Sequence, residues 1–362
     1  MTRSRIFAFS VFATLSFVIG ASSHPEAQGP ATHPIIKFNV PGAGTGAGQG
    51  TIPAGILDSD WIIGNYIDSS GVNHGFLRSP ARKITKIDYP GGQATFAEGI
   101  NSSGAVTGFY LDTSGVGHGF VRSSGGKFTG PLDDPDAGTG SGQGTLSTDI
   151  NTNGELAGEY LDSNGTYHGF VYSGGKFTNF DAPGAGTGSG QGTLLAGLCG
   201  LTDTGVTVGS YIDSSGVYHG FLRYHSGKFA HFVDPSGSVN TLVDGLSSNE
   251  TVAGTYYDSS GLFHGFLRAV GGKVTPFDVK GAAATAVNNV NPGGVVAGAY
   301  YDSDDAFHGY VRTPGGVYTK FSVQGAGNGA GQGTSANYSN SKGWITGNYV
   351  DSSGVNHGFV RE

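Results

Sequence analysis

Aspartate and histidine recur together along this chain at a spacing of six residues. The pattern Gly-x-Tyr-x-Asp is followed, six residues after its aspartate, by His-Gly-Phe or His-Gly-Tyr, and the combination occurs seven times. A carboxylate beside an imidazole can serve as an acid–base pair, as two metal ligands or as a structural hydrogen bond. The pairs are Asp68 and His74, Asp112 and His118, Asp162 and His168, Asp213 and His219, Asp258 and His264, Asp302 and His308, and Asp351 and His357.

The sevenfold recurrence of the pair favours a structural role. A catalytic dyad is needed once, and a zinc site needs three or four ligands, whereas each copy offers one histidine and one aspartate. The turn sequence Asp-Ser-Ser-Gly also lacks the several carboxylates of a calcium loop. We therefore predict no metal and no cofactor, and a repeated hydrogen bond that holds a turn whose amides the aspartate also accepts. If Asp351 lies opposite His357 across a hairpin, alternation places Tyr349 opposite Phe359.

The seven copies divide the chain of 362 residues into repeats of 44 to 51 residues. Each repeat contains four short runs typical of β-strands, which we name a, b, c and d, separated by Gly, Ser, Asp and Asn. No segment carries a convincing helical period. Four strands in a repeat of this length are typical of a propeller blade. The sequence thus predicts an all-β fold, a seven-bladed β-propeller of four-stranded antiparallel blades.

The two ends of the chain predict how the ring closes. The last repeat stops at Glu362 after strand c, and the segment from Ile35 to Val40 is similar to strand d of the other repeats. We expect this N-terminal strand to complete the last blade, which would leave no exposed edge strand. The predicted organisation is a signal peptide at 1–23, a short linker at 24–34 and a single propeller at 35–362.

The first 23 residues have the three parts of a secretory signal. Arg3 and Arg5 precede an apolar run from Ile6 to Gly20, and small residues follow. The run is shorter than the roughly 20 residues that span a bilayer. We predict a secreted protein, periplasmic or extracellular, with no membrane span after signal removal. The formal net charge is −8 and basic clusters are lacking, which excludes nucleic acid as a partner, and the single cysteine, Cys199, allows no internal disulfide.

The repeats resemble those of the bacterial extracellular HAF-repeat family, which read roughly IN-x-x-G-x-x-x-G followed by HAF. The corresponding stretches here are INSSGAVTGFYLDTSGVGHGF at 100–120 and INTNGELAGEYLDSNGTYHGF at 150–170. The resemblance covers residues 35–361. The chain departs from the family in having Gly in place of the Ala and no consistent Trp after the Phe. The resemblance implies an exported, propeller-like repeat protein and brings no catalytic residues.

Function is expected where the repeats differ from one another. The segments that join strand d to the next strand a have two lengths, and four of them read GAGTGAGQGT or a close variant, five residues longer than the other three. Their glycines could bring backbone amides to a ligand, or the loops could pack on themselves. Neither a lysine nor a helix follows, which excludes a phosphate-binding loop. Candidate side-chain donors are Gln49, Gln143, Gln191 and Gln332.

Four successive repeats carry an aromatic residue directly before the histidine. If the rings are exposed, they form an arc suited to stacking on sugars or on a partner surface. If they are buried, they fill the space between blades. The four are Tyr167, Tyr218, Phe263 and Phe307.

Strand a is expected to line the central channel. Its third position after a recurring threonine holds carboxylates in two repeats, Glu98 and Asp244. Two carboxylates about 5 to 9.5 Å apart would suit glycoside hydrolysis, whereas a polar channel lining is the simpler interpretation.

These observations predict a binding or scaffold module for a glycan or a protein partner rather than an enzyme. The alternatives are a carbohydrate-active hydrolase or lyase that uses Glu98 and Asp244, and a purely structural protein of the cell envelope.

Overall fold

The computed structural model describes residues 34–197, 200–231, 234–235 and 237–362. The predicted signal peptide, the linker up to residue 33 and Cys199 lie outside these residues. Within the described ranges the chain forms 28 β-strands and no helix, which confirms the all-β prediction. Accordingly, no described segment is a helix with the length and apolarity to cross a membrane.

Antiparallel pairing groups the strands into seven meanders of four, which we call units 1 to 7. Unit 1 contains β2 (Gly50–Ile56), β3 (Ile62–Ile67), β4 (Asn73–Arg78) and β5 (Ile84–Ile87). Unit 2 contains β6 (Ala94–Ile100), β7 (Val106–Leu111), β8 (Gly117–Arg122) and β9 (Phe128–Leu132). Unit 3 contains β10 (Gly144–Ile150), β11 (Leu156–Leu161), β12 (Tyr167–Ser173) and β13 (Lys176–Phe180).

The remaining units repeat the same order. Unit 4 contains β14 (Gly192–Leu195), β15 (Thr207–Ile212), β16 (Tyr218–Arg223) and β17 (Phe229–His231). Unit 5 contains β18 (Ser238–Leu246), β19 (Val252–Asp258), β20 (Phe263–Arg268) and β21 (Val274–Phe277). Unit 6 contains β22 (Ala284–Val290), β23 (Val296–Tyr301), β24 (Phe307–Arg312) and β25 (Tyr318–Phe321). Unit 7 contains β26 (Gly333–Ser339), β27 (Ile345–Val350), β28 (Asn356–Arg361) and β1 (Ile35–Phe38).

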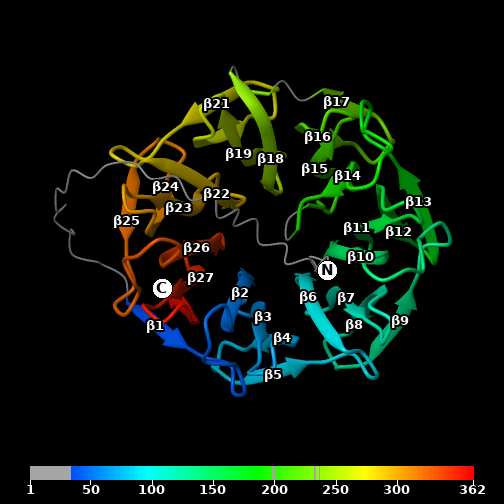
Figure 1. The fold of residues 1–362 in the computed structure, drawn as a ribbon, viewed down its shortest axis with the longest axis horizontal. Coiled ribbons are helices and arrows are strands. Elements are labelled where there is room, and N and C mark those ends of the chain that lie inside the picture. The colour runs from blue at the N-terminus through cyan, green and yellow to red at the C-terminus, as the bar shows by residue number, and fades with distance from the viewer. Residues whose placement is uncertain (1–33, 198–199, 232–233, 236) are drawn as a thin grey trace, which may run out of the picture.

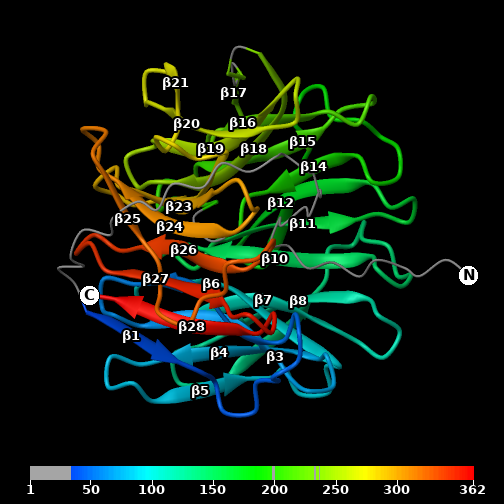
Figure 2. The same ribbon diagram turned by 60° about the vertical axis from the view of Figure 1, so that its left-hand side comes forward.

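The units are arranged around a common centre, with the first strand of units 1 to 6 and β26 of unit 7 innermost (Figure 1). The outermost strand of unit 7 comes from the start of the described chain. β1 lies antiparallel to β28, from Ile35 opposite Arg361 to Phe38 opposite Gly358, and Figure 2 shows the two strands side by side. This is the pairing that the sequence predicts for the N-terminal segment.

The apolar core lies between neighbouring units. The Phe or Tyr of each His-Gly-Phe/Tyr motif is almost fully buried and lies opposite the glycine of Gly-x-Tyr-x-Asp, as Phe76 lies opposite Gly64. A Cβ atom at Gly64 would be 2.9 Å from the Phe76 ring, so the glycine makes room for it. Adjacent units then share clusters of apolar residues. The cluster between units 1 and 2 contains Ile63, Leu77, Ile87, Ala97, Val106 and Phe120.

Polar contacts fix the first strand of each unit. The threonine that opens this strand is buried, and in six units its Oγ1 accepts a backbone N–H from the preceding segment at 2.8–3.0 Å, as Thr51 does from Val40. Asparagines also join one unit to the next. Asn340 Nδ2 donates to the carbonyl oxygen of Leu57 (3.1 Å), and Asn337 Nδ2 donates to that of Pro53 (2.7 Å). Units 7 and 1 are therefore direct neighbours.

Candidate functional site

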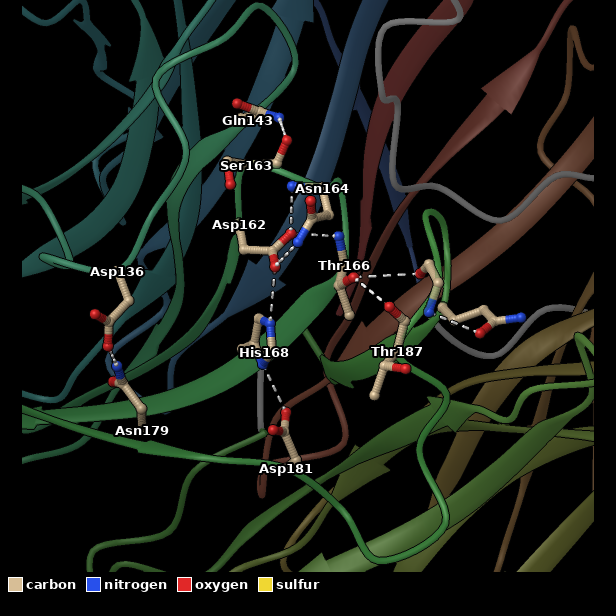
Figure 3. Close-up of polar contacts among 12 residues, drawn as sticks. Asp136, Gln143, Asp162, Ser163, Asn164, Thr166, His168, Asn179, Asp181 and Thr187 are labelled. Carbon is tan, nitrogen blue, oxygen red and sulfur yellow. Dashed lines mark hydrogen bonds and ion pairs between the residues drawn. The ribbon is translucent and has the colours of Figure 1, made fainter.

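The Asp–His pairs form the same arrangement in all seven units. One carboxylate oxygen of the aspartate accepts two amides of the turn between strands b and c, and the other faces His Nε2 at 2.9–3.7 Å. In unit 3, Asp162 accepts the amides of Asn164 and Thr166, both at 2.8 Å (Figure 3). The Tyr of each Gly-x-Tyr-x-Asp stacks on the histidine ring, with centroids 4.8–5.0 Å apart.

Each histidine has a second polar partner that our reading of the sequence missed. In unit 3, His168 Nδ1 lies 2.9 Å from Asp181, directly after strand d (Figure 3). The equivalent partners in the seven units are Asp88, Asp133, Asp181, Asp234, Asp278, Ser322 and Asn39. The sequence could have indicated these partners, because a polar residue follows strand d in every repeat. Both ring nitrogens are thus engaged within one unit, and the arrangement joins the b–c turn to the end of strand d.

The register of these hairpins differs from the predicted one. Tyr349 lies opposite His357, and Gly347 rather than Tyr349 lies opposite Phe359. The prediction was wrong because the turn closes two residues tighter: the Asp351 amide donates to the carbonyl of Val355, and Gly354 adopts a left-handed φ of 80°. Asp351 is therefore not the residue opposite His357 in the strand register; it lies in the turn and reaches the imidazole from there, at 3.1 Å.

The turn amides lower the pKa of several of these aspartates. Donation by the Val72 amide is the largest cause for Asp68, and donation by the Ser260 hydroxyl lowers the pKa of Asp258 to about 2. These carboxylates are therefore ionised at neutral pH and held by their own turns. In the part of the chain that the structure describes, no group of three or more His, Cys, Asp or Glu side chains is placed to share a metal ion.

The four long loops fasten neighbouring units together. Each makes one parallel residue pair with the preceding unit, such as Gly192 with Tyr167, and these pairs join the units into two sheets of 12 strands, leaving unit 5 as a separate four-stranded sheet. A Cβ atom at Gly192, where φ is 114°, would lie 2.0 Å from the Tyr167 carbonyl oxygen. The glycines thus permit close contact between chain segments, and their amides bind protein carbonyls rather than forming an open cradle.

The four candidate glutamines belong to the same junctions. The Oε1 of Gln143 accepts the amide of Gly140 at 2.8 Å. Its Nε2 donates to the Ser163 carbonyl at 3.0 Å (Figure 3). Gln49, Gln191 and Gln332 make the equivalent two bonds. The structure therefore places these side chains between loop and turn, where they hold both in position.

The four candidate aromatic residues do not form a uniformly exposed arc. Tyr167 and Phe307 are only 5% and 3% exposed, whereas Tyr218 and Phe263 are half-buried. Tyr167 and Phe307 start strand c where a neighbouring unit covers them, and Tyr167 packs among leucines of units 3 and 4. The sequence could not show this burial, because the residues that cover the two rings belong to another repeat.

Two tyrosines that the sequence analysis missed extend the aromatic group. The Phe263 ring lies 5.7 Å from that of Tyr257 and 5.0 Å from that of Tyr301, and Tyr301 lies 6.0 Å from Phe307. Both tyrosines directly precede the aspartate of Gly-x-Tyr-x-Asp, where the other repeats carry Ile, Leu or Val. This departure from the repeat pattern could have identified them from the sequence. We call the six rings the aromatic belt: Tyr167, Tyr218, Tyr257, Phe263, Tyr301 and Phe307.

Carboxyl groups with raised pKa values lie on the inner strands. Glu98 and Asp244 occupy β-bulges of β6 and β18, where the register with the next strand shifts by one residue and the side chain is re-aimed. Burial raises the pKa of each to about 7. Asn65 Nδ2 lies 3.5 Å from Glu98, and the Thr255 hydroxyl donates to Asp244 at 2.8 Å.

Glu159 is a third such carboxyl, and our sequence analysis did not single it out. It is 3% exposed and accepts the amide of Leu195 from unit 4 at 2.8 Å. Burial, and secondarily the charge of Glu98, raise its pKa to about 8. The predicted pair of Glu98 and Asp244 makes no contact among the described residues. Glu98 interacts instead with Glu159, because their units are adjacent.

Asp244 lies beside one part of the belt, because it accepts the hydroxyl of Thr255, two residues before Tyr257 on β19. Burial raises the pKa of Tyr257, and the nearby Asp244 and Tyr218 add to this effect. Burial, then Glu159 and Tyr218, likewise raise the pKa of Tyr167. Asp244, which is half-protonated at neutral pH, is thus the carboxyl group beside the partly exposed belt, a combination suited to a neutral ligand rich in hydroxyl groups. Glu159 is buried between units 3 and 4 and is closed to a ligand.

Comparison with known proteins shows the fold alone. No family model matches the chain, and no curated protein matches it in sequence. Among solved structures, virginiamycin B lyase from Staphylococcus aureus is similar with 12% identity and a TM-score of 0.53, covering 91% of this chain and 99% of the lyase. The BP39L lectin from Burkholderia pseudomallei has 15% identity and a TM-score of 0.55, covering 84% of this chain and 92% of the lectin.

A puromycin hydrolase structure is also similar, with 11% identity and a TM-score of 0.53, covering 84% of this chain and 50% of the hydrolase. A lyase, a lectin and a hydrolase thus share this architecture, so the likeness assigns no activity. Together with the four-stranded units around a common centre, it shows a β-propeller fold.

Proposed function

We propose that this chain is an exported, seven-bladed β-propeller that acts as a binding module for glycans. Pairing of β1 with β28 and the hydrogen bonds from unit 7 to unit 1 support a closed ring in which each unit is one blade. The secretory features of residues 1–23 and the resemblance to HAF repeats support export and membership of that family.

One observation carries the glycan assignment: Tyr257, a belt residue that keeps exposed surface, follows two residues after Thr255 on β19, and the Thr255 hydroxyl donates to the carboxyl group of Asp244. The C–H face of a sugar ring is apolar and packs on aromatic rings, while carboxyl groups exchange hydrogen bonds with sugar hydroxyls. Four belt residues retain exposed surface: Tyr218, Tyr257, Phe263 and Tyr301. One of the similar structures is a lectin, which agrees with this class of ligand without assigning it.

The experiment is glycan-array binding of the full chain beside Tyr218→Ala and Tyr257→Ala. Phe128→Ala is the matched control, because Phe128 is also half-buried but lies on the outer strand β9, away from the belt. We expect binding that falls at least tenfold in the belt variants, about 1.4 kcal/mol, and stays unchanged in the control. Folding of every variant is checked by circular dichroism.

The same array separates the alternatives. A hydrolase or lyase is favoured by the pKa of Glu98, about 7, because a general acid must hold a proton at neutral pH. It would release cleaved sugars, and Glu98→Gln would abolish that release. Glycans recovered intact identify a binding module. Absence of binding to any glycan, or equal binding by belt variants and wild type, would contradict the proposal and leave a module for a protein partner or a structural protein of the envelope.

A further inference from the structure

A small cavity lies between units 7 and 1, at the end of the strands opposite the Asp–His turns. Its volume is about 110 Å³, and it opens beside the turn between β2 and β3 and the turn between β4 and β5. We call it the 7–1 pocket. Its wall includes Asp60, Ile62, Arg78, Arg82, Trp344 and Glu362.

Arg78 presents a buried positive charge to this pocket. The residue is 6% exposed, and its guanidinium stacks over the Phe38 ring at 4.8 Å. Among the described residues, no hydrogen bond or ion pair of this guanidinium is found, and the nearby Glu362 carboxylate offsets only part of its charge. Buried charges are normally paired, because water no longer solvates them fully. The fork of N–H donors is therefore available to an anion that enters the pocket.

Arg82 is held in an unfavourable backbone conformation at the pocket rim. Its φ is 65°, in the left-handed region that glycine prefers. The same turn position, defined by its amide bond to the residue three before it, is glycine in four other units: Gly126, Gly227, Gly272 and Gly316. Unit 1 thus carries an arginine where four other units carry a glycine, and this places a cationic side chain at the pocket. Residues in strained backbone conformations tend to occur at functional sites.

Asp60 shows the same departure on the other side of the pocket. Its φ is also 65°, and the equivalent position is glycine in five of the other six units. Two of the four non-glycine residues with positive φ in the described chain therefore line one cavity. Lys342 Nζ fixes the Asp60 carboxylate at 3.0 Å and lies 5.7 Å above the Trp344 ring.

The charges at the pocket suit a singly charged anion. The charges of Lys342 and Asp60 cancel in their ion pair. The two arginines, Arg78 and Arg82, then exceed the single carboxylate of Glu362 by one positive charge. A dianion such as phosphate would face two carboxylates, whereas one carboxylate group fits the planar fork of an arginine. Trp344, which is half-buried, offers an apolar ring face for the remainder of the ligand, whereas Ile62 beneath it is only 1% exposed.

We propose that the 7–1 pocket binds a small organic carboxylate whose single ring packs against Trp344 while its carboxylate group contacts Arg78 and Arg82. This site is separate from the aromatic belt and does not depend on glycan binding there. Both acidic sugars and aromatic acids carry the required chemistry, and the test distinguishes them.

The test is isothermal titration calorimetry of the full chain with glucuronate and benzoate, each beside its neutral counterpart, glucose or benzyl alcohol, and with inorganic phosphate. We expect one or both carboxylates to bind at least tenfold more tightly than the neutral counterpart and than phosphate. Binding of glucuronate alone identifies an acidic sugar, and binding of benzoate alone identifies an aromatic acid. No binding of either carboxylate, equal binding of the neutral compounds, or tighter binding of phosphate would overturn the proposal.

The decisive variant is Arg82→Gly, which restores the residue of the other units. We expect carboxylate affinity to fall at least tenfold while the melting temperature stays level or rises by about 1 to 3 °C, because the left-handed strain is removed. Glu250→Gly is the matched control: Glu250 has a φ of 63° in the β18–β19 turn, far from the pocket. It should show the same thermal gain with unchanged affinity. Unchanged affinity in Arg82→Gly would refute the assignment.

Discussion

Glu159 illustrates how a single side chain can couple the stability of this molecule to pH. Its carboxyl group lies between units 3 and 4, accepts the Leu195 amide, and has a pKa near 8. An unfolded glutamate ionises near pH 4.3, so the unfolded chain releases this proton several pH units before the folded chain does. The folded state therefore loses stability as the pH rises from about 4.5 to about 8, by at most about 1.4 kcal/mol per pH unit.

Replacing Glu159 by Gln should remove this dependence, since the amide still accepts the Leu195 N–H but does not ionise. We expect the melting temperature of Glu159→Gln to exceed that of wild type by a margin that grows from pH 5 to pH 8. Differential scanning fluorimetry across that range measures it. Asp304→Asn, a change of equal charge on the exposed surface, is the control and should show a constant offset. A margin that does not change with pH would contradict the raised pKa.

The long loop is the element that distinguishes one junction from another. Where it occurs, before units 1, 3, 4 and 7, its backbone pairs with the preceding unit, and its glutamine holds the b–c turn of the unit that follows. The glycine at the pairing point cannot carry a side chain, since the Cβ would overlap a carbonyl oxygen. Other loop glycines have positive φ with open space around them. Comparing the two kinds of glycine therefore distinguishes the cost of a steric overlap from the cost of the left-handed backbone conformation.

Gly192→Ala should therefore destabilise the protein more than Gly190→Ala. Both residues have positive φ, 114° and 76°, so each substitution carries a conformational cost of about 1 to 2 kcal/mol. Only at Gly192 does the new Cβ meet a backbone atom, the Tyr167 carbonyl oxygen at 2.0 Å, which raises the expected cost to about 3 kcal/mol or more. Urea denaturation of the two variants measures the difference. Equal losses of unfolding free energy in the two variants would contradict the prediction, because they would show that the backbone at Gly192 moves aside at no energetic cost.

At the scale of the whole molecule, the ends of the described chain meet in unit 7. β1 supplies the outer strand beside β28, and Val40, directly after it, is 2% exposed in the core shared with unit 1. Without β1, β28 would present an unpaired edge and the apolar contacts of Phe38 and Val40 would be lost.

Deletion of residues 35–40 should sharply lower the melting temperature, by more than about 10 °C if two buried apolar side chains and one strand pairing are lost together. Lys37→Ala is the control, because it alters an exposed side chain and keeps the backbone pairing. An unchanged melting point in the deletion variant would refute closure of the ring by β1.

The sequence by itself determined the local structure of this protein. The recurring Gly-x-Tyr-x-Asp and His-Gly-Phe motifs, with turn residues between short apolar runs, predict the strands within each unit, because strands and turns depend on residues close in the chain. Even the pairing of the first described strand with the last could be predicted, since the missing strand d of the last repeat stands at the other end.

Tertiary structure alone decided what depends on neighbouring units. The burial of Tyr167 and Phe307, the interaction of Glu98 with Glu159 rather than Asp244, and the 7–1 pocket arise where side chains of adjacent units meet. The side chains of the long-loop glutamines are likewise held by tertiary contacts, with main-chain groups of their own loop and of the b–c turn. Even the hairpin register, a local feature, was misjudged by two residues because the left-handed glycine tightened the turn. A repeat pattern specifies each unit, but the surroundings of a side chain in a ring come largely from the next unit, and those contacts form only when the units pack.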